Sequence, residues 1–112
     1  MRRLEHNSIV DLVEIYLAKH HLNDYIKKYF VYPLGEMDIL RVHDKVEWNA
    51  YEIKSRDTTK LRNKAYEQLF RFQKFMVRTL PNNQVRTYFV RPVGPRVTIT
   101  EIDYSELEKK LK

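Results

Sequence analysis

Three charged residues, Asp38, Glu52 and Lys54, have the types and spacing of a catalytic site. Asp38 lies in one predicted strand, and Glu52 and Lys54 lie in the next, where alternation points both side chains to the same face. A short turn at 43–45 predicts a hairpin, which makes Asp38 and Glu52 near neighbours without requiring them to be direct partners. Two adjacent carboxylates repel each other unless a cation joins them, and such hard oxygen ligands suit Mg²⁺ or Mn²⁺. A lysine beside that metal can orient and help deprotonate water or stabilise charge on a phosphate, as in metal-assisted phosphodiester hydrolysis.

A structural interpretation of the same residues stays open. Charged side chains on a hairpin commonly form a solvated face with a weak cross-strand ion pair. The pattern Glu-x-Lys has little specificity, since it recurs at Glu108–Lys110. The copy at Glu52 differs in context, because its charges alternate with Tyr51 and Ile53 on a strand predicted to be central. Charges in such a strand need a reason, and catalysis is one.

Composition limits the classes of function. The 112 residues predict one domain, 1–112, and contain no cysteine, which excludes disulfide scaffolds, thiolate metal sites and a cysteine nucleophile. Lys and Arg number 21 against 15 Asp and Glu, and the formal net charge of +6 favours a polyanionic partner, most simply nucleic acid. No apolar run is long enough to span a bilayer, and no secretory signal is evident, so we expect a cytoplasmic protein without a membrane partner.

Hydrophobic periodicity predicts an α/β fold with a mixed central sheet flanked by helices. The two glycines lie beside proline-containing turns and separate strands. The predicted elements, in chain order, are a helix within 1–22, strands at 28–32, 36–42 and 46–54, a helix from about 58 to 78, strands at 85–91 and 96–102, and a helix at 104–112.

The segments Gly35–Leu40 and Tyr51–Arg56 resemble the motif of the PD-(D/E)XK nuclease superfamily. Within that superfamily, their residue types are most similar to those of archaeal Holliday-junction resolvases and RecB-like nuclease domains. The core of that restriction-endonuclease-like fold runs α-β-β-β-α-β, with the motif on its second and third strands, and the predicted order matches it. The resemblance covers roughly residues 3–92. One departure is Met37, which stands where the family name has proline.

The resemblance implies a Mg²⁺- or Mn²⁺-dependent DNA endonuclease of repair or recombination, including the case of a junction resolvase. Asp38 and Glu52 would bind the metal together with the backbone carbonyl of Ile53, and Lys54 would activate water or stabilise the transition state. A resolvase would act as a homodimer, and the apolar strands Tyr29–Tyr32 and Val85–Val90 offer surface for one. The alternatives are a RecB-like exonuclease or single-strand nuclease and, in another class, a non-catalytic nucleic-acid-binding module.

Family members often add an acidic residue from the first helix and a glutamine from the helix after the third strand. Glu5 and Glu14 are the acidic candidates, and Glu5 lies on the core side of a helical wheel, unless the helix begins at Ser8 and leaves Glu5 loose. Gln68, followed by Phe72 where the RecB-like motif has tyrosine, lies between the apolar and basic sides of its helix. It could reach the site or be an ordinary boundary residue.

A basic stripe runs along the predicted helix 58–78. The default interpretation is a solvated helix face, but in a nuclease this face would contact backbone phosphates. The histidines lack ligand spacing and are interpreted as surface or boundary residues. The stripe comprises Lys60, Lys64, Arg71, Lys74 and Arg78, and Arg2, Arg3, Arg56 and Arg62 could extend it.

Overall fold

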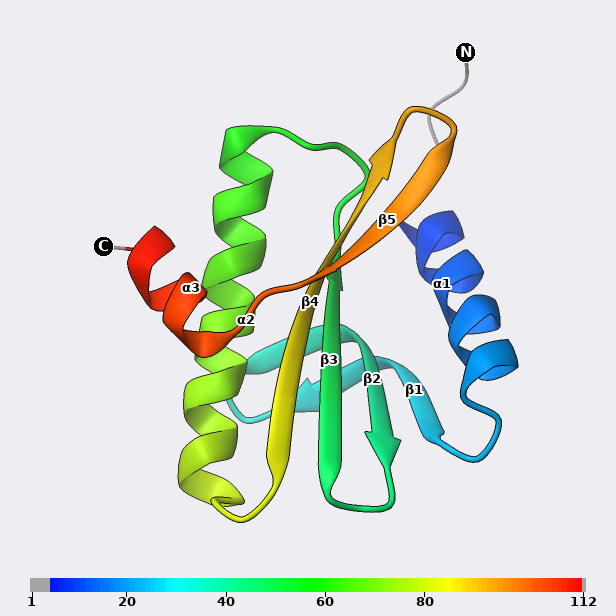
Figure 1. Cartoon of the computed structure of the whole chain (residues 1–112). Coiled ribbons are helices and arrows are strands. Elements are labelled where there is room, and N and C mark those ends of the chain that lie inside the picture. Colours follow the sequence, from blue (N-terminus) through cyan, green and yellow to red (C-terminus); the bar gives the residue numbers. More distant parts are fainter. Residues whose placement is uncertain (1–4, 112) are drawn as a thin grey trace.

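The computed structural model describes residues 5–111 and confirms the predicted order α-β-β-β-α-β-β-α. Most boundaries agree with the sequence prediction within one or two residues. The exception is the first strand, which begins three residues early because Tyr25, Ile26 and Lys27 pair with the second strand. The elements are α1 (His6–His20), β1 (Tyr25–Tyr32), β2 (Gly35–His43), β3 (Glu47–Ile53), α2 (Thr59–Thr79), β4 (Gln84–Val93), β5 (Arg96–Glu101) and α3 (Tyr104–Lys110) (Figure 1).

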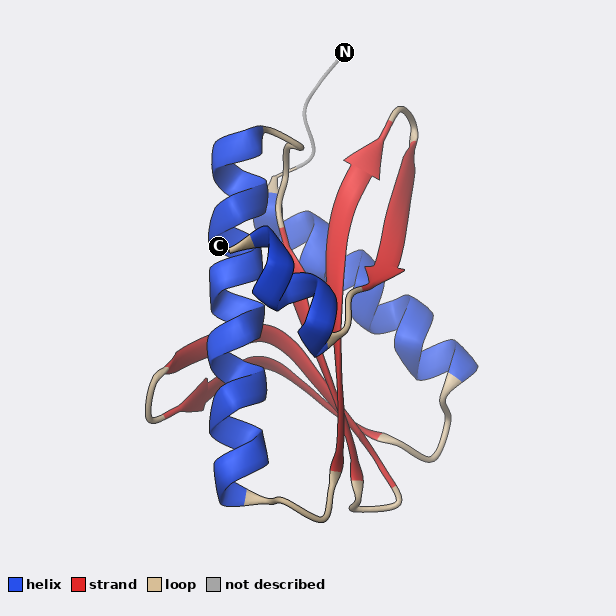
Figure 2. Ribbon diagram, turned by 60° about the vertical axis from the view of Figure 1, so that its left-hand side comes forward, coloured by secondary structure: helices blue, strands red, loops and turns tan. Residues whose placement is uncertain are grey.

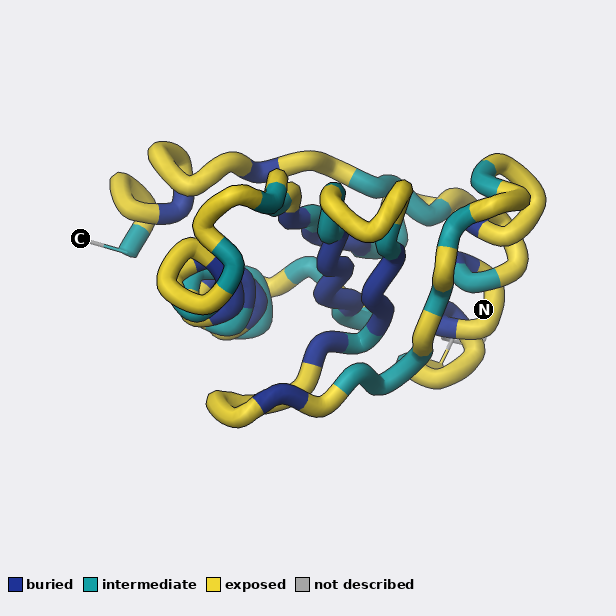
Figure 3. The backbone as a smooth tube through the Cα atoms, turned by 90° about the horizontal axis from the view of Figure 1, so that it is seen from below, coloured by how far each residue is buried: buried dark blue, intermediate teal, exposed yellow. Residues whose placement is uncertain are grey.

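The five strands form one mixed sheet in the order β1-β2-β3-β4-β5. β3 and β4 are parallel and are connected through α2, whereas the other neighbours are antiparallel. α1 lies on one side of the sheet, and α2 with α3 lies on the other (Figures 1 and 2). β3 is central, and residues 49–53 are all buried, as Figure 3 shows for the middle of the sheet.

Two apolar clusters follow from this layering. Because successive strand residues face opposite sides, Ala50 packs toward α2 while Tyr51 packs toward α1. Glu52 therefore shares the face of Ala50 and looks toward α2. The cluster under α2 and α3 includes Leu40, Ala50, Leu69, Phe72, Phe89 and Leu107. The cluster under α1 includes Ile9, Val13, Leu17, Ile39, Tyr51 and Val90.

The β1–β2 hairpin is bent at Tyr29. This residue has φ 54°, in the left-handed region that a bulky side chain rarely adopts. It lies between the pairs Lys28↔Ile39 and Phe30↔Met37, opposite Asp38. Beyond the bend the hairpin reaches α2, where the buried Tyr32 meets Phe72 edge to face at 5.3 Å between ring centroids. Asp38 therefore lies at the point where the hairpin bends.

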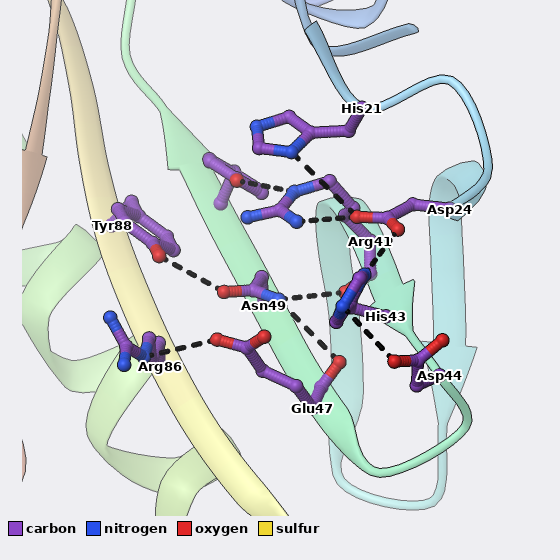
Figure 4. A network of polar contacts seen from close by, with 10 residues as sticks. His21, Asp24, Arg41, His43, Asp44, Glu47, Asn49, Arg86 and Tyr88 are labelled. Atoms are coloured by element: carbon purple, nitrogen blue, oxygen red, sulfur yellow. Dashed lines mark hydrogen bonds and ion pairs between the residues drawn. The ribbon is translucent and has the colours of Figure 1, made fainter.

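A polar network ties the loop after α1 to the sheet (Figure 4). The Arg41 side chain, which is 9% exposed, donates to Asp24 at 2.6 Å and to the Tyr51 hydroxyl at 3.0 Å. Asp24 also lies 2.7 Å from Nδ1 of His43, and the hydroxyl of Tyr88 donates to Oδ1 of Asn49 at 2.9 Å. These contacts pair the buried guanidinium with a carboxylate, as burial of a charge requires.

The apolar strands that suggested a dimer surface are mostly used inside the chain. Tyr32, Phe89 and Val90 are buried, whereas Val31 is 71% exposed. Most of this apolar surface is therefore covered within the chain, and a homodimer stays a prediction. Among residues 5–111, no helix combines the length and apolar character needed to cross a bilayer.

Candidate active site

Asp38 and Glu52 meet where β2 and β3 stop pairing. The last pair of this ladder is Ile39↔Tyr51, which makes Asp38 and Glu52 the next residues on their strands. The amide of Asp38 donates to Oε1 of Glu52 at 3.2 Å, and the amide of Ile53 donates to Oδ2 of Asp38 at 2.8 Å. Side-chain carboxylates thus accept the backbone amides at this point, which fixes both carboxyl groups. The expectation that Asp38 and Glu52 are near neighbours is confirmed.

Glu52 is an acidic side chain in the core. The residue is 1% exposed, and burial, together with the nearby charge of Asp38, raises its pKa to about 8. The positive charge of Lys54 lowers the pKa of Glu52, and the negative charge of the exposed Glu36 raises it further. A buried carboxyl group with this pKa is largely protonated at neutral pH, so a cation placed beside it would favour its ionised form.

Lys54 and Gln68 complete the side of the site that faces α2. Nζ of Lys54 lies 3.9 Å from Oε2 of Glu52 and donates to Oε1 of Gln68 at 3.2 Å. The amide of Lys54 donates to the carbonyl of Val90 at 3.0 Å, so the parallel neighbour β4 fixes the backbone here. The structure therefore places Gln68 beside the ammonium group of Lys54, one of the two positions that the sequence left open.

His6 reaches the site from the first turn of α1. Its Nε2 lies 3.2 Å from Oδ2 of Asp38, and its side chain is 38% exposed. Sequence reasoning placed His6 at the surface or boundary, which its exposure fits, but it missed the contact with Asp38. No local pattern marks this contact, because it depends on how α1 docks against the bent β2 strand.

The two acidic candidates of the first helix differ in their surroundings. Glu5 is the exposed N-cap residue of α1, directly before His6, and within the described part of the chain it forms no hydrogen bond or ion pair with Asp38 or Glu52, so its role in the site stays a prediction. The helix begins at His6, between the two starts considered from the sequence. Glu14 lies 3.5 Å from Lys28 and so belongs to a surface ion pair.

The basic stripe of α2 is exposed along its length, as expected from its period. Arg71 is its member nearest to the β1–β2 hairpin, since its Nη1 lies 3.5 Å from the carbonyl of Leu34. Arg62 does not extend the stripe as a free cation, because it is paired with Asp57 at 2.8 Å. Arg2 and Arg3 lie outside the described residues. The exposed residues of the predicted interface are Arg56, Lys60, Lys64, Arg71, Lys74 and Arg78.

The carboxylate oxygens of Asp38 and Glu52 are ligands that a hard divalent cation prefers. Oδ1 of Asp38 and Oε2 of Glu52 have no hydrogen bond from any residue in 5–111, which leaves one oxygen on each carboxylate to bind a metal. The amide of Ile53 contacts the Asp38 carboxylate, and the imidazole of His6 is a further donor for Mn²⁺, whereas the predicted ligand role of the Ile53 carbonyl stays a prediction. Within the described chain, no group of three or more His, Asp or Glu side chains is already arranged around a common metal position.

Comparison of the chain with protein-family models, with curated proteins and with solved structures gave no match.

Proposed function

We propose that this protein is a metal-dependent DNA endonuclease that hydrolyses phosphodiester bonds. The observation that carries the proposal is the buried carboxyl group of Glu52 beside the partly buried Asp38, with Lys54 3.9 Å from Glu52. A core carboxylate beside a second carboxylate is costly to the fold. A structural protein gains nothing from this arrangement, whereas a nuclease uses it to bind Mg²⁺ or Mn²⁺. The motif resemblance and the element order point to the same chemistry.

Each residue has a definable part in this reaction. Bound by Asp38, Glu52 and the Ile53 carbonyl, the metal would supply positive charge for the scissile phosphate and for activation of water. Lys54 would hold or deprotonate the attacking water and stabilise charge developing on the phosphate. Gln68 would orient the Lys54 ammonium group through their 3.2 Å hydrogen bond. His6 would hold the Asp38 carboxylate in place.

The exposed stripe of α2 would bind the DNA backbone beside the site. Gln68 is on the same helix, and Arg71 follows it by one turn, so phosphates held by the stripe would pass near Lys54. Cations on a regular helix contact phosphates without reading bases, so the binding would be independent of sequence and dependent on salt.

The test is cleavage of labelled four-way junction, duplex, flap and single-stranded DNA, each with Mg²⁺, with Mn²⁺ and with EDTA. We expect cleavage that requires the metal and is abolished in Asp38→Asn, Glu52→Gln and Lys54→Met. Glu108→Gln is the matched control, because it removes the acidic residue of the second Glu-x-Lys string, which lies in α3. Wild-type cleavage by Asp38→Asn or Glu52→Gln would refute the site, and preferred cutting of junctions by a dimer would indicate a resolvase.

A second candidate is a nucleic-acid-binding module without catalysis. The absence of a preformed three-residue ligand group within residues 5–111 favours it. This candidate predicts DNA binding that is unaffected by metal, and no cleavage of any of the four substrates.

A further inference from the structure

A groove crosses the exposed side of α2 between the tip of the β1–β2 hairpin and the end of α3. It has a volume of about 450 Å³ and is open to solvent. Leu34 lines it at the hairpin, and Leu111 lines it after α3. Arg71 lines the groove and lies about one helical turn after Gln68, which contacts Lys54 of the candidate active site.

The groove carries a net positive charge. Arg71, Lys74 and Arg78 line it, and Glu67 is the one acidic residue among its lining side chains. Within residues 5–111, none of the three cations forms an ion pair: Arg71 contacts the carbonyl of Leu34, and the ammonium of Lys74 lies 4.9 Å from the ring centroid of Phe70. All three side chains are exposed, so they can turn toward phosphates at little cost.

Two aromatic side chains share the groove with these cations. Phe70 and Phe75 line it and are half-buried. Phe75 rests on Tyr32 at 5.3 Å and Phe70 on Tyr104 at 5.0 Å between ring centroids, so both rings are supported from behind. The contact of Lys74 with Phe70 shows that the Phe70 ring is open to a cation on that side. A flexible lysine can leave this position when a flat group takes its place.

We propose that this groove binds an unpaired, single-stranded segment of the nucleic-acid substrate and leads it toward Asp38 and Glu52. Proteins that bind single strands without sequence preference combine cations with exposed aromatic rings. The cations contact the phosphates, and the bases stack on the rings. Paired bases are stacked inside a duplex and cannot lie on Phe70 or Phe75. The volume is in the range of small-ligand sites, which suits one or two nucleotides. The proposal rests on the proposed nuclease function and narrows it to substrates with a single-stranded part.

The test measures binding in EDTA, where cleavage cannot interfere, by fluorescence anisotropy with oligonucleotides of about 12 nucleotides. We expect wild-type protein to bind the single strand more tightly than the same sequence as a duplex. Phe70→Leu and Phe75→Leu keep the apolar bulk but remove the stacking face. Each should weaken single-strand binding about fivefold or more and change duplex binding less than twofold.

Charge reversal supplies the second arm of the test. Lys74→Glu with Arg78→Glu should remove the preference for single strands, whereas Lys19→Glu with Lys45→Glu makes the same change of charge at exposed positions outside the groove. The control should lower both affinities equally through net charge alone. Equal losses on single strand and duplex in the groove variant, or no loss at all, would overturn the proposal.

Photocrosslinking keeps the proposal testable if a variant misfolds. Wild-type protein with a single strand that carries 5-iodouracil should crosslink at Phe70 or Phe75, and crosslinks confined to other surfaces would overturn the groove. Failure of the nuclease would look different. Groove-dependent single-strand binding without metal-dependent cleavage would contradict the proposed function, while cleavage without groove-dependent binding would contradict only this inference.

Discussion

The amide of Asp38 donates to the carboxylate of Glu52 at 3.2 Å, although the two side chains carry like charges when both are ionised. The hydrogen bond stabilises the ionised form of Glu52, while burial and the Asp38 carboxylate act against it, and the balance raises the Glu52 pKa to about 8. The fold therefore holds a carboxyl group in a place where its charged form is unfavourable without a cation. That stored electrostatic cost is the property that the first two predictions measure.

Removing one of the two charges should stabilise the metal-free protein while abolishing cleavage. Glu52→Gln and Asp38→Asn keep an oxygen acceptor for the backbone amides but end the repulsion, so we expect the free energy of unfolding to rise by about 1 kcal/mol or more. DNA binding should be largely spared, because the phosphate contacts that we propose lie on α2. Urea unfolding, DNA cleavage and DNA binding check this, and Glu108→Gln should change none of the three. A large loss of stability in both variants would contradict the electrostatic argument.

The gain in stability of Glu52→Gln should increase with pH. The pKa of Glu52 is raised from its ordinary 4.5 to about 8 in the folded protein, so between these values the folded state binds a proton that the unfolded state has released. The contribution of Glu52 to stability therefore falls as pH rises through this window and reaches its most unfavourable value above about pH 8. We expect the variant and the wild type to differ little near pH 4 and by a few kcal/mol near pH 8.5. Urea unfolding across this range checks it, and Mg²⁺ should reduce the difference at the alkaline end. An equal difference at both ends would show that the carboxyl group titrates normally.

The order of elements could be predicted because each has its own local signal. The period of Ile9, Leu12, Val13, Tyr16 and His20 predicted the first helix, and the aromatic and β-branched run before Pro33 predicted a strand. The helix is confirmed, but its buried face is rotated toward Val10 and Leu17, because Leu12 and Tyr16 are 50% exposed. The hairpin of β2 and β3 followed from the short turn, and it brought Asp38 to Glu52 as expected. Strand ends were less accurate, because β1 starts where its partner β2 allows pairing.

The parts of the site that the sequence did not reveal depend on tertiary docking. The contact of His6 with Asp38 needs the packing of α1 against β2, and the left-handed Tyr29 is a position where local preference is overridden. The wheel put Glu5 on the core side, but Glu5 precedes the first helical residue and so escapes the helical period. The periodic pattern predicted that a helix forms, but it gave the buried face of α1 only approximately and did not indicate which side chain at the helix end contacts β2.

The stripe on α2 should set the salt dependence of DNA binding. Replacing Lys64, Arg71 and Lys74 by alanine should weaken binding to all duplex sequences alike and reduce the slope of log affinity against log salt by about 0.9 for each phosphate that no longer meets a cation. These side chains are exposed, so the melting temperature should stay nearly constant. Anisotropy titrations at several salt concentrations measure the slope. An unchanged slope would show that the stripe is an ordinary solvated face.

His6 should matter for cleavage and little for folding. His6→Ala removes the imidazole that lies 3.2 Å from Asp38 and leaves that carboxylate less firmly held. We expect cleavage to fall about tenfold or more, with a higher Mn²⁺ concentration needed for half-maximal rate, as for partners of metal ligands. His20→Ala, at an exposed position on the same helix, is the matched control. Equal cleavage by both variants across the Mn²⁺ titration would show that the His6 contact has no functional role.

The network at the other end of the sheet should matter for folding and not for cleavage chemistry. Asp24→Ala leaves the buried guanidinium of Arg41 without its carboxylate, so we expect a loss of about 3–5 kcal/mol in the free energy of unfolding. Burial opposes ionisation of Asp24, but the hydrogen bonds from His43 and Arg41 outweigh it and hold the pKa of Asp24 below its usual range. The stabilisation from Asp24 is therefore present above the usual pKa of an aspartate and is lost as pH falls through the lowered value.

A double variant can show whether the stability lost in Asp24→Ala comes from the unpaired charge of Arg41 or from a general loss of packing. Arg41→Met with Asp24→Ala removes both charges and keeps most of the apolar bulk, so it should recover much of the stability that Asp24→Ala loses. Asp44→Asn removes the charge of a side chain that is 79% exposed, and asparagine suits the left-handed backbone of this position, so the variant should change the free energy of unfolding by less than about 0.5 kcal/mol. Urea unfolding near neutral pH compares the three variants. If the double variant is no more stable than Asp24→Ala, then the unpaired charge of Arg41 is not the cause of the loss, and the network stabilises the sheet by packing alone.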